Sequence, residues 1–163
     1  MRLVEGVADV TDVDAFVARL SGIGDEFGCA VQAFDARLVA GEDHLATAVE
    51  HANRSFARGE NVARDRAVEV LLYAAGRRQI DQALALGVEA GETPAVVVVD
   101  GEDEAGAADA VRELLTPAAT LGEAADEGDI GEYFGVTDAE RSATTADLQT
   151  LVCERVALLD VEK

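Results

Sequence analysis

Hydrophobic and polar residues follow two periods along this chain, and these periods predict its elements. Short apolar runs bounded by turn residues are typical of β-strands, and they lie at 3–8, 29–34, 95–99 and 156–161. Elsewhere, apolar residues recur every three or four positions, as on the buried face of a helix. The predicted helices cover about 13–20, 42–58, 62–75, 78–86, 104–115 and 148–153, with a short piece after Thr137.

The run at 95–99 is the plainest strand. Its four consecutive valines favour burial on both faces, as in a central strand covered by helices. A chain of 163 residues has the length of one domain, and no internal repeat or linker divides it. The pattern therefore predicts a single α/β (α+β) domain over residues 1–163, with a small mixed sheet of about four strands packed with helices.

The charge of the chain points to its environment. It has 33 acidic against 13 basic residues, a net charge of −20, and Lys163 is its only lysine. The acidic residues are scattered over predicted helix surfaces and loops, which keeps a protein soluble at high salt. We therefore expect a halophilic archaeal source. The first residues lack the apolar core of a signal peptide, and no apolar run reaches about 20 residues, so we expect a cytoplasmic protein without a membrane partner.

Motifs for catalysis are incomplete. The run Val-Val-Val-Val-Asp at 96–100 resembles the metal-binding strand of an ATPase, but no phosphate-binding loop with its lysine accompanies it. Gly22, Gly24 and Gly28 end a predicted helix instead of following a strand, so they do not form a dinucleotide loop. Cys29 and Cys153 are isolated and apolar-flanked, as core residues are. We expect no enzyme, no cofactor and no metal site.

The basic residues are concentrated in one segment. Six arginines lie between positions 54 and 78, here called the arginine island, and they give that segment a charge of +3 against −23 for the rest of the chain. The members are Arg54, Arg58, Arg64, Arg66, Arg77 and Arg78. His44, Thr47, His51, Arg54 and Arg58 recur at helical spacing, opposite an apolar stripe, so this helix has a basic polar face.

Two interpretations of the arginine island stay open. The arginines would pair with neighbouring acidic helices, or they would form an anion site, since arginine is suited to phosphate. At about 1 M salt the screening length is only about 3 Å, so RNA binding would depend on short-range contacts. Forked arginine contacts together with histidine and glutamine (Gln79, Gln82) meet that requirement.

Two stretches resemble a known family. One is the stretch at 35–45, Asp-Ala-Arg-Leu-Val-Ala-Gly-Glu-Asp-His-Leu, which is followed by Ala48 and Ala52. The other is Glu-Val-Leu-Leu-Tyr-Ala-Ala-Gly-Arg-Arg-Gln-Ile-Asp-Gln-Ala at 69–83. Both are similar to the KEOPS-complex subunit that binds the complex's kinase-like protein, in animals the PRPK-binding protein. The likeness covers nearly the whole chain, and its specific part is 35–87.

The resemblance implies a role rather than a reaction. In KEOPS, a separate subunit makes threonylcarbamoyladenosine in tRNA, and the subunit similar to this chain docks on the kinase-like ATPase and clamps the 3′ CCA end. The transferase subunit is then an indirect partner. The RNA contacts implied are first Arg77, Arg78, Gln79 and Ile80, and second His44, His51, Arg54, Arg58 and Arg64.

Other surfaces and functions stay open. For the unstacked bases of the RNA end, Ile80 or Tyr73 would supply an apolar platform, although the spacing of both residues also fits buried core positions. The resemblance implies an apolar partner contact near the C-terminal end, and a role in the core is the alternative for the same residues: Leu148, Leu151, Val152, Leu158 and Leu159. A small phosphate-binding regulatory domain is the alternative function, and an enzyme with a carboxylate metal site after Val99 is a third.

Overall fold

The fold is built on a four-stranded sheet in the order β2-β3-β1-β4. A computed structural model describes residues 1–162, with the side chains of residues 1–161. The strands are β1 (Arg2–Val10), β2 (Cys29–Asp35), β3 (Gly91–Gly101) and β4 (Thr116–Pro117). The predicted α+β class and the number of strands are confirmed, but every pairing in the described part of the chain is antiparallel, so the sheet is not mixed.

The valine run is the centre of this sheet. β3 pairs with β1 and with β2, so that Val99 lies opposite Arg2 on one side and Val31 on the other. Val96 and Val98 are buried in one hydrophobic cluster, and Val97 and Val99 in a second cluster on the opposite face. The predicted burial on both faces is therefore confirmed.

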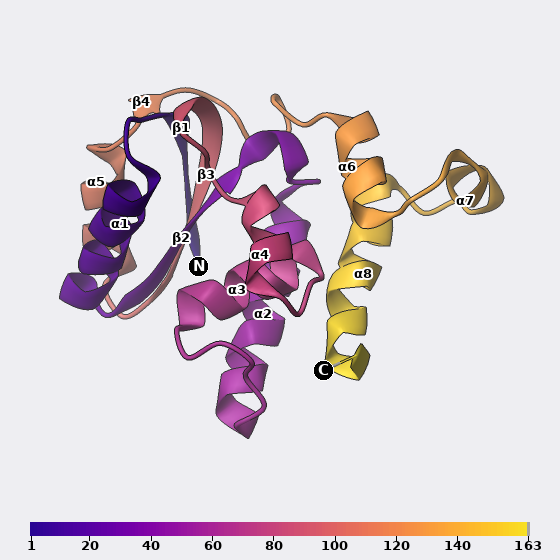
Figure 1. Cartoon of the computed structure of the whole chain (residues 1–163), viewed down its shortest axis with the longest axis horizontal. Coiled ribbons are helices and arrows are strands. Elements are labelled where there is room, and N and C mark those ends of the chain that lie inside the picture. Colours follow the sequence, from indigo (N-terminus) through magenta and orange to yellow (C-terminus); the bar gives the residue numbers. More distant parts are fainter. Residues whose placement is uncertain (163) are drawn as a thin grey trace.

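Two helices cover one face of the sheet (Figure 1). They are α1 (Val13–Phe27) and α5 (Glu104–Arg112). The carboxylate of Asp12 caps α1 by accepting the N–H of Ala15 at 3.2 Å. The helix passes through Gly22 and Gly24 and ends at Gly28, whose φ of 67° is the left-handed conformation that favours glycine. Of the three glycines predicted to end this helix, only the last one does so.

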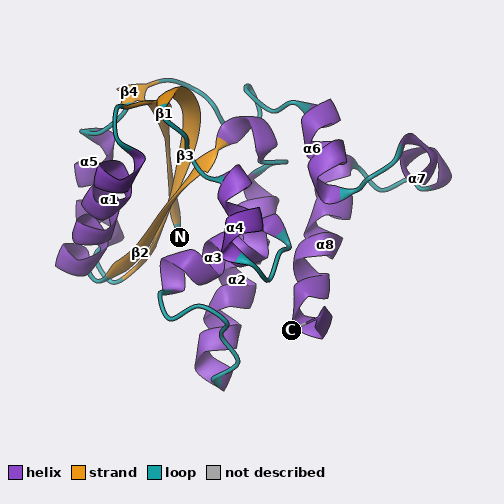
Figure 2. Ribbon diagram, viewed as in Figure 1, coloured by secondary structure: helices purple, strands orange, loops and turns teal. Residues whose placement is uncertain are grey.

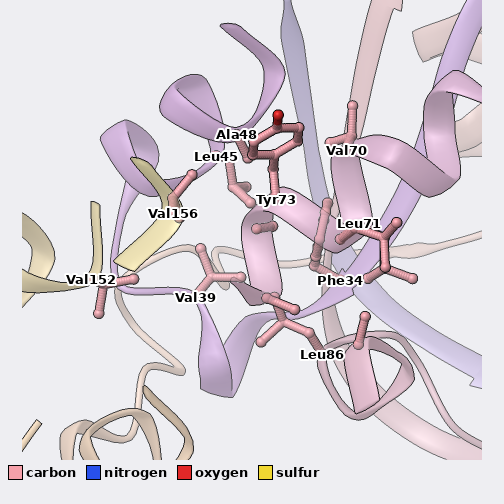
Figure 3. Close-up of a cluster of buried hydrophobic side chains, with 14 of the residues drawn as sticks. Phe34, Val39, Leu45, Ala48, Val70, Leu71, Tyr73, Leu86, Val152 and Val156 are labelled. Atoms are coloured by element: carbon pink, nitrogen blue, oxygen red, sulfur yellow. The ribbon is translucent and has the colours of Figure 1, made fainter. Parts of the chain in front are cut away.

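The other face carries the larger hydrophobic cluster (Figure 3). Phe34 of the sheet packs there with Leu45, Tyr73 and Val156, which come from three different helices. The helices on this side are α2 (Glu42–Arg58), α3 (Arg66–Ala75), α4 (Ile80–Ala83), α6 (Glu127–Phe134) and α8 (Leu148–Glu162). Two 3₁₀ turns, η1 (Ala36–Leu38) and η2 (Leu84–Leu86), and the short α7 (Asp138–Ala143) complete the chain. The predicted cap of α7 is confirmed, because Thr137 Oγ1 accepts the N–H of Glu140 at 3.1 Å.

The predicted strand at 156–161 is wrong, since α8 continues without a break through this segment. The fourth strand of the sheet is β4 instead. Buried residues of α8 recur at helical spacing and pack on α2 and α3, and this packing outweighs the strand preference of a short valine-leucine run: Leu148, Leu151, Val152, Val156 and Leu159. Among residues 1–162, no helix has the length and apolar character needed to cross a bilayer.

The predicted helix at 62–75 begins only at Arg66, and a buried carboxylate explains why. Glu69 is fully buried and accepts the N–H groups of Val62 (3.1 Å) and Ala63 (3.0 Å) and the hydroxyl of Ser55 (2.9 Å). These bonds hold the segment before α3 as a loop. In a helix that began at Val62, the N–H groups of Val62 and Ala63 would belong to the first turn and would have no carbonyl partner within the helix, so the carboxylate satisfies them instead.

Candidate functional site

The chain reverses direction at Gly76, between α3 and α4. Gly76 has a φ of 63°, and its N–H and that of Arg77 bond to the carbonyls of Tyr73 (3.0 Å) and Leu72 (3.1 Å). These two bonds close the C-terminus of α3. A side chain at this position would also approach the carbonyl oxygen of Arg155 in α8 to 3.4 Å. The left-handed backbone therefore favours glycine at this position, whereas the distance to Arg155 is an ordinary van der Waals contact.

Arg77 lies against an aromatic ring that the sequence did not single out. Its guanidinium carbon is 4.6 Å from the ring centroid of Tyr133 in α6, and its Nη2 donates to the Tyr133 carbonyl. The Tyr133 hydroxyl donates in turn to the carbonyl of Gln82 at 2.9 Å. Burial raises the pKa of Tyr133, and the nearby Arg77 cation opposes that rise. Arg77 thus ties the segment after Gly76 to α6.

The residues that follow Arg77 face solvent. Arg78 and Gln79 are exposed, and Ile80 and Leu84 keep 48% and 57% of their surface accessible. We call these four residues the α4 surface. Ile80 and Leu84 are four positions apart, so they share one side of α4 and η2. The helix predicted at 78–86 is in fact this short α4 followed by a 3₁₀ turn, and it begins at Ile80.

The arginine island is divided by its ion pairs. Arg54 pairs with Glu50 at 2.8 Å on the surface of α2, and Arg66 donates to Asp100 and to Asn53, both at 2.7 Å. The interpretation as pairing with acidic neighbours therefore holds for these two arginines. Arg58 and Arg64 are exposed, and in the described part of the chain they have no ion pair.

Asp100, the carboxylate after the valine run, is used structurally. It accepts from Arg66 and Asn53 and pairs with the N-terminal ammonium of Met1 at 3.2 Å. Burial alone would raise its pKa, but the hydrogen bonds from Arg66 and Asn53 outweigh burial and lower the pKa below its usual value. Within residues 1–162, no group of three histidine, cysteine or acidic side chains is placed to hold a metal.

His44 is wrong as a predicted RNA contact, because it is fully buried. Its Nδ1 accepts the N–H of Ala40 at 3.1 Å, so Nε2 carries the proton and donates to the carbonyl of Ala74 at 2.7 Å. The ring packs edge-on against Phe134, with 5.3 Å between centroids. Burial lowers the pKa of His44 to about 4. The histidine joins the start of α2 to the end of α3.

His51 and Tyr73 also point inward. The Nδ1 of His51 lies 2.6 Å from Asp160 Oδ2, and the Tyr73 hydroxyl donates to the other oxygen of the same carboxylate. Only 14% of the His51 side chain is accessible, and Tyr73 is fully buried. Tyr73 is therefore wrong as a predicted base platform, and His51 joins α2 to α8 instead of extending the basic face toward solvent.

The sequence was compared with models of known protein families, and one of them matches. The model of the family described as kinase binding protein CGI-121 matches residues 7–160, which is nearly the whole chain. The chain belongs to the CGI-121 family of kinase-binding proteins. Among curated proteins, none is similar enough to this chain to count as a match. The family assignment agrees with the resemblance carried by the stretches at 35–45 and 69–83.

In this CGI-121 family member, the predicted apolar partner contact is mostly core. Four of its residues are at most 5% exposed and belong to the larger hydrophobic cluster: Leu148, Leu151, Val152 and Leu159. Their burial favours the alternative given for these residues, a role in the core. Leu158 is 50% exposed and Val161 is 81% exposed, three positions apart on the outer side of α8.

Proposed function

We propose that this chain is the non-catalytic accessory subunit of a KEOPS complex, which binds the kinase-like ATPase subunit and the 3′ CCA end of tRNA. The α4 surface is the observation that carries the proposal. It presents two large apolar side chains, a glutamine amide and an arginine beside the rigid Arg77–Tyr133 pair. The scattered acidity supports a halophilic host, and a cytoplasmic place of action is part of the proposal.

A single-stranded RNA end needs these side-chain types. Unstacked bases gain from packing on apolar or aromatic faces, and their edges need donors and acceptors that a glutamine amide supplies. Ile80 and Leu84 provide adjacent apolar area, and Gln79 presents its amide at the beginning of the same short helix. Arg78 would meet the phosphate. Because these contacts are short-range, they retain strength where salt screens bulk attraction.

Arg58 and Arg64 form a second part of the proposed surface. Arg58 is the last residue of α2 and Arg64 lies in the loop that joins α2 to α3, whereas the α4 surface lies beyond the opposite end of α3. A helix of 10 residues is about 15 Å long, which separates the two parts by several nucleotides of a single strand. Arg58 and Arg64 would contact the RNA backbone away from the terminal bases.

A compact phosphate site has less support. The arginines of the island point to different partners and do not converge on one cavity, since Arg54 is bound to Glu50 and Arg66 to Asp100. The enzyme alternative loses its carboxylate, because Asp100 is hydrogen-bonded by Arg66 and Asn53. We therefore retain the view that the chain has no catalytic activity of its own.

For the kinase-like partner, we propose a contact that includes Leu158 and Val161. Both are exposed on one side of the last turns of α8, and exposed apolar side chains that cluster mark protein interfaces. Leu158→Arg is expected to abolish co-purification with the kinase-like subunit. Val62→Arg, at a similarly exposed valine (50%) in the loop between α2 and α3, serves as the control and should leave co-purification intact.

The tRNA test compares full-length tRNA with tRNA that lacks its CCA end, in concentrated KCl. Full-length tRNA should bind more tightly, and Ile80→Ala should weaken this binding roughly tenfold, because the full burial of an isoleucine side chain against a base is worth about 1.5–3 kcal/mol. The same substitution should not change binding of the trimmed tRNA. Equal affinity for both RNAs, or no binding of either with the kinase-like subunit present, would refute the clamp.

A further inference from the structure

A cleft of about 850 Å³ lies beside β2, and it shares one lining residue, Leu84, with the α4 surface. Its lining is mainly aliphatic, with few charged groups. Six consecutive residues of one stretch, 28–33, contribute to it. Because successive side chains of a strand point to opposite faces of the sheet, a cleft that reaches all of them runs along the edge of the strand.

Helices wall this edge on both sides. Val17 and Leu20 of α1 line it from one face of the sheet, and Val68 and Leu71 of α3 line it from the other. Leu84, Ala85 and residues 87–90, including Val88, also contribute. Figure 2 shows β2 running between α1 and α3. The cleft is thus a slot at the sheet edge between two helical layers, and it suits one strand rather than a globular surface.

The edge of β2 is open within the described chain. The sheet pairs β2 only with β3, and no other backbone segment of residues 1–162 bonds to positions 29–33. Exposed edges are usually protected by lysine, proline or a very short strand. The opposite edge strand, β4, has only 2 residues and ends at Pro117. β2 has 7 residues and contains neither lysine nor proline.

The charged groups of the slot favour a basic occupant. Asp25, Asp65 and Glu89 line it together with a single cation, Arg66, which is bound to Asp100. The lining therefore carries a net negative charge. A second copy of this chain is a poor occupant, because each copy has a net charge of −20 and its own helices flank its β2 edge.

We propose that the slot beside β2 accepts an extended segment of a partner protein as a fifth strand. Backbone hydrogen bonds along β2 would give affinity, and the two aliphatic walls would select a segment that is apolar on both faces. The acidic lining selects lysine or arginine near the ends of that segment. At present the Gln32 side-chain amide donates to the Ala33 carbonyl at 2.9 Å, a bond that a strand N–H would replace.

The test uses a capped synthetic peptide as long as β2, 7 residues, with valine and alanine in its centre and lysine and arginine at its ends. Two peptides are compared with it, one with glutamate at both ends and one with N-methylated central residues. Binding is followed by fluorescence anisotropy, and amide hydrogen exchange is measured at residues 29–33. Val17→Arg blocks the slot, and Val62→Arg is its control, since Val17 and Val62 are 53% and 50% exposed and only Val17 lines the slot.

The basic peptide should bind, slow the exchange of amides within 29–33, and lose at least about tenfold in affinity with Val17→Arg but not with Val62→Arg. The glutamate and N-methylated peptides should bind more weakly. Equal binding of the N-methylated peptide would mean an apolar pocket without strand addition. A concentration-dependent dimer that Val17→Arg dissociates would mean a second copy of the chain. Either result, or no binding of the basic peptide, overturns the proposal, and none depends on tRNA or on the kinase-like subunit.

Discussion

Protonation of the buried His44 should make the fold sensitive to mild acid. The ring has no room for a second proton on Nδ1, because that nitrogen already accepts the N–H of Ala40. No acidic side chain bonds to either ring nitrogen to stabilise a cation, since the partner of Nε2 is the carbonyl of Ala74. Replacing His44 with glutamine keeps one donor and one acceptor in the site but removes the titration.

The sign and size follow from the pKa. Burial lowers the pKa of His44 from 6.5 to about 4 in the folded protein, so the unfolded chain takes up a proton first as the pH falls. The contribution of neutral His44 to stability is therefore complete above pH 6.5 and is lost progressively as the pH falls toward about 4. At about 1.4 kcal/mol per pH unit, the loss amounts to about 3 kcal/mol.

The measurement is denaturant unfolding of the wild type and His44→Gln at pH 7 and near pH 4.5, at constant salt. Carboxylates titrate in the same range, but they are common to both proteins and cancel in the difference. We expect the wild type to lose about 2–3 kcal/mol more than the variant between the two pH values. Parallel losses in both proteins would show that His44 does not have the lowered pKa from which this reasoning starts.

Three other buried or half-buried groups give further tests. Glu69→Gln should lower the free energy of unfolding by about 2–4 kcal/mol, because one of the two oxygens that accept from Ser55, Val62 and Ala63 becomes an NH₂ donor. Calorimetry compares this variant with Glu60→Gln, at an exposed position, and equal stability of the two would contradict the prediction. Arg66→Gln should cost about 1–3 kcal/mol, since Asp100 loses its main hydrogen-bond donor, and an unchanged denaturation midpoint would contradict this. Arg155 joins α8 to the carbonyls of residues 134 and 135 and to the Glu140 carboxylate, so Arg155→Ala should speed proteolytic cleavage within α7, and cleavage at the wild-type rate would refute the role.

Periodicity predicted the sheet core and the helices that pack by one clear stripe. The valines of β3 and the apolar face of α2 are such cases, because their burial is local to one element. It misassigned 156–161 to a strand, since a short run of valine and leucine is compatible with both structures until its packing partner is known. Periodicity also placed His44 on the exposed face of its helix. A polar residue at the edge of an apolar stripe has the same spacing whether it faces solvent or packs against another segment, as His44 does against the end of α3.

Only part of the candidate site could be predicted from the sequence. Gln79 and Ile80 were implied by the family resemblance of the stretch at 69–83, and their contact with RNA stays a prediction, whereas Tyr133 is 57 positions after Gly76 and reaches Arg77 only through the fold. The place of Leu84 beside Ile80 follows from their spacing, since four residues place both on one side of a helix.

Two buried polar side chains hold the two parts of the proposed RNA surface. Glu69 bonds to the loop that carries Arg64, and His44 bonds to the carbonyl of Ala74, two residues before Gly76. Both side chains act on α3, one near each end, and both satisfy backbone groups that would otherwise be unpaired in the core. The proposed RNA surface therefore depends on Glu69 and His44, which would not contact RNA themselves, because exposed arginines can make short-range contacts only if the loops that present them are fixed.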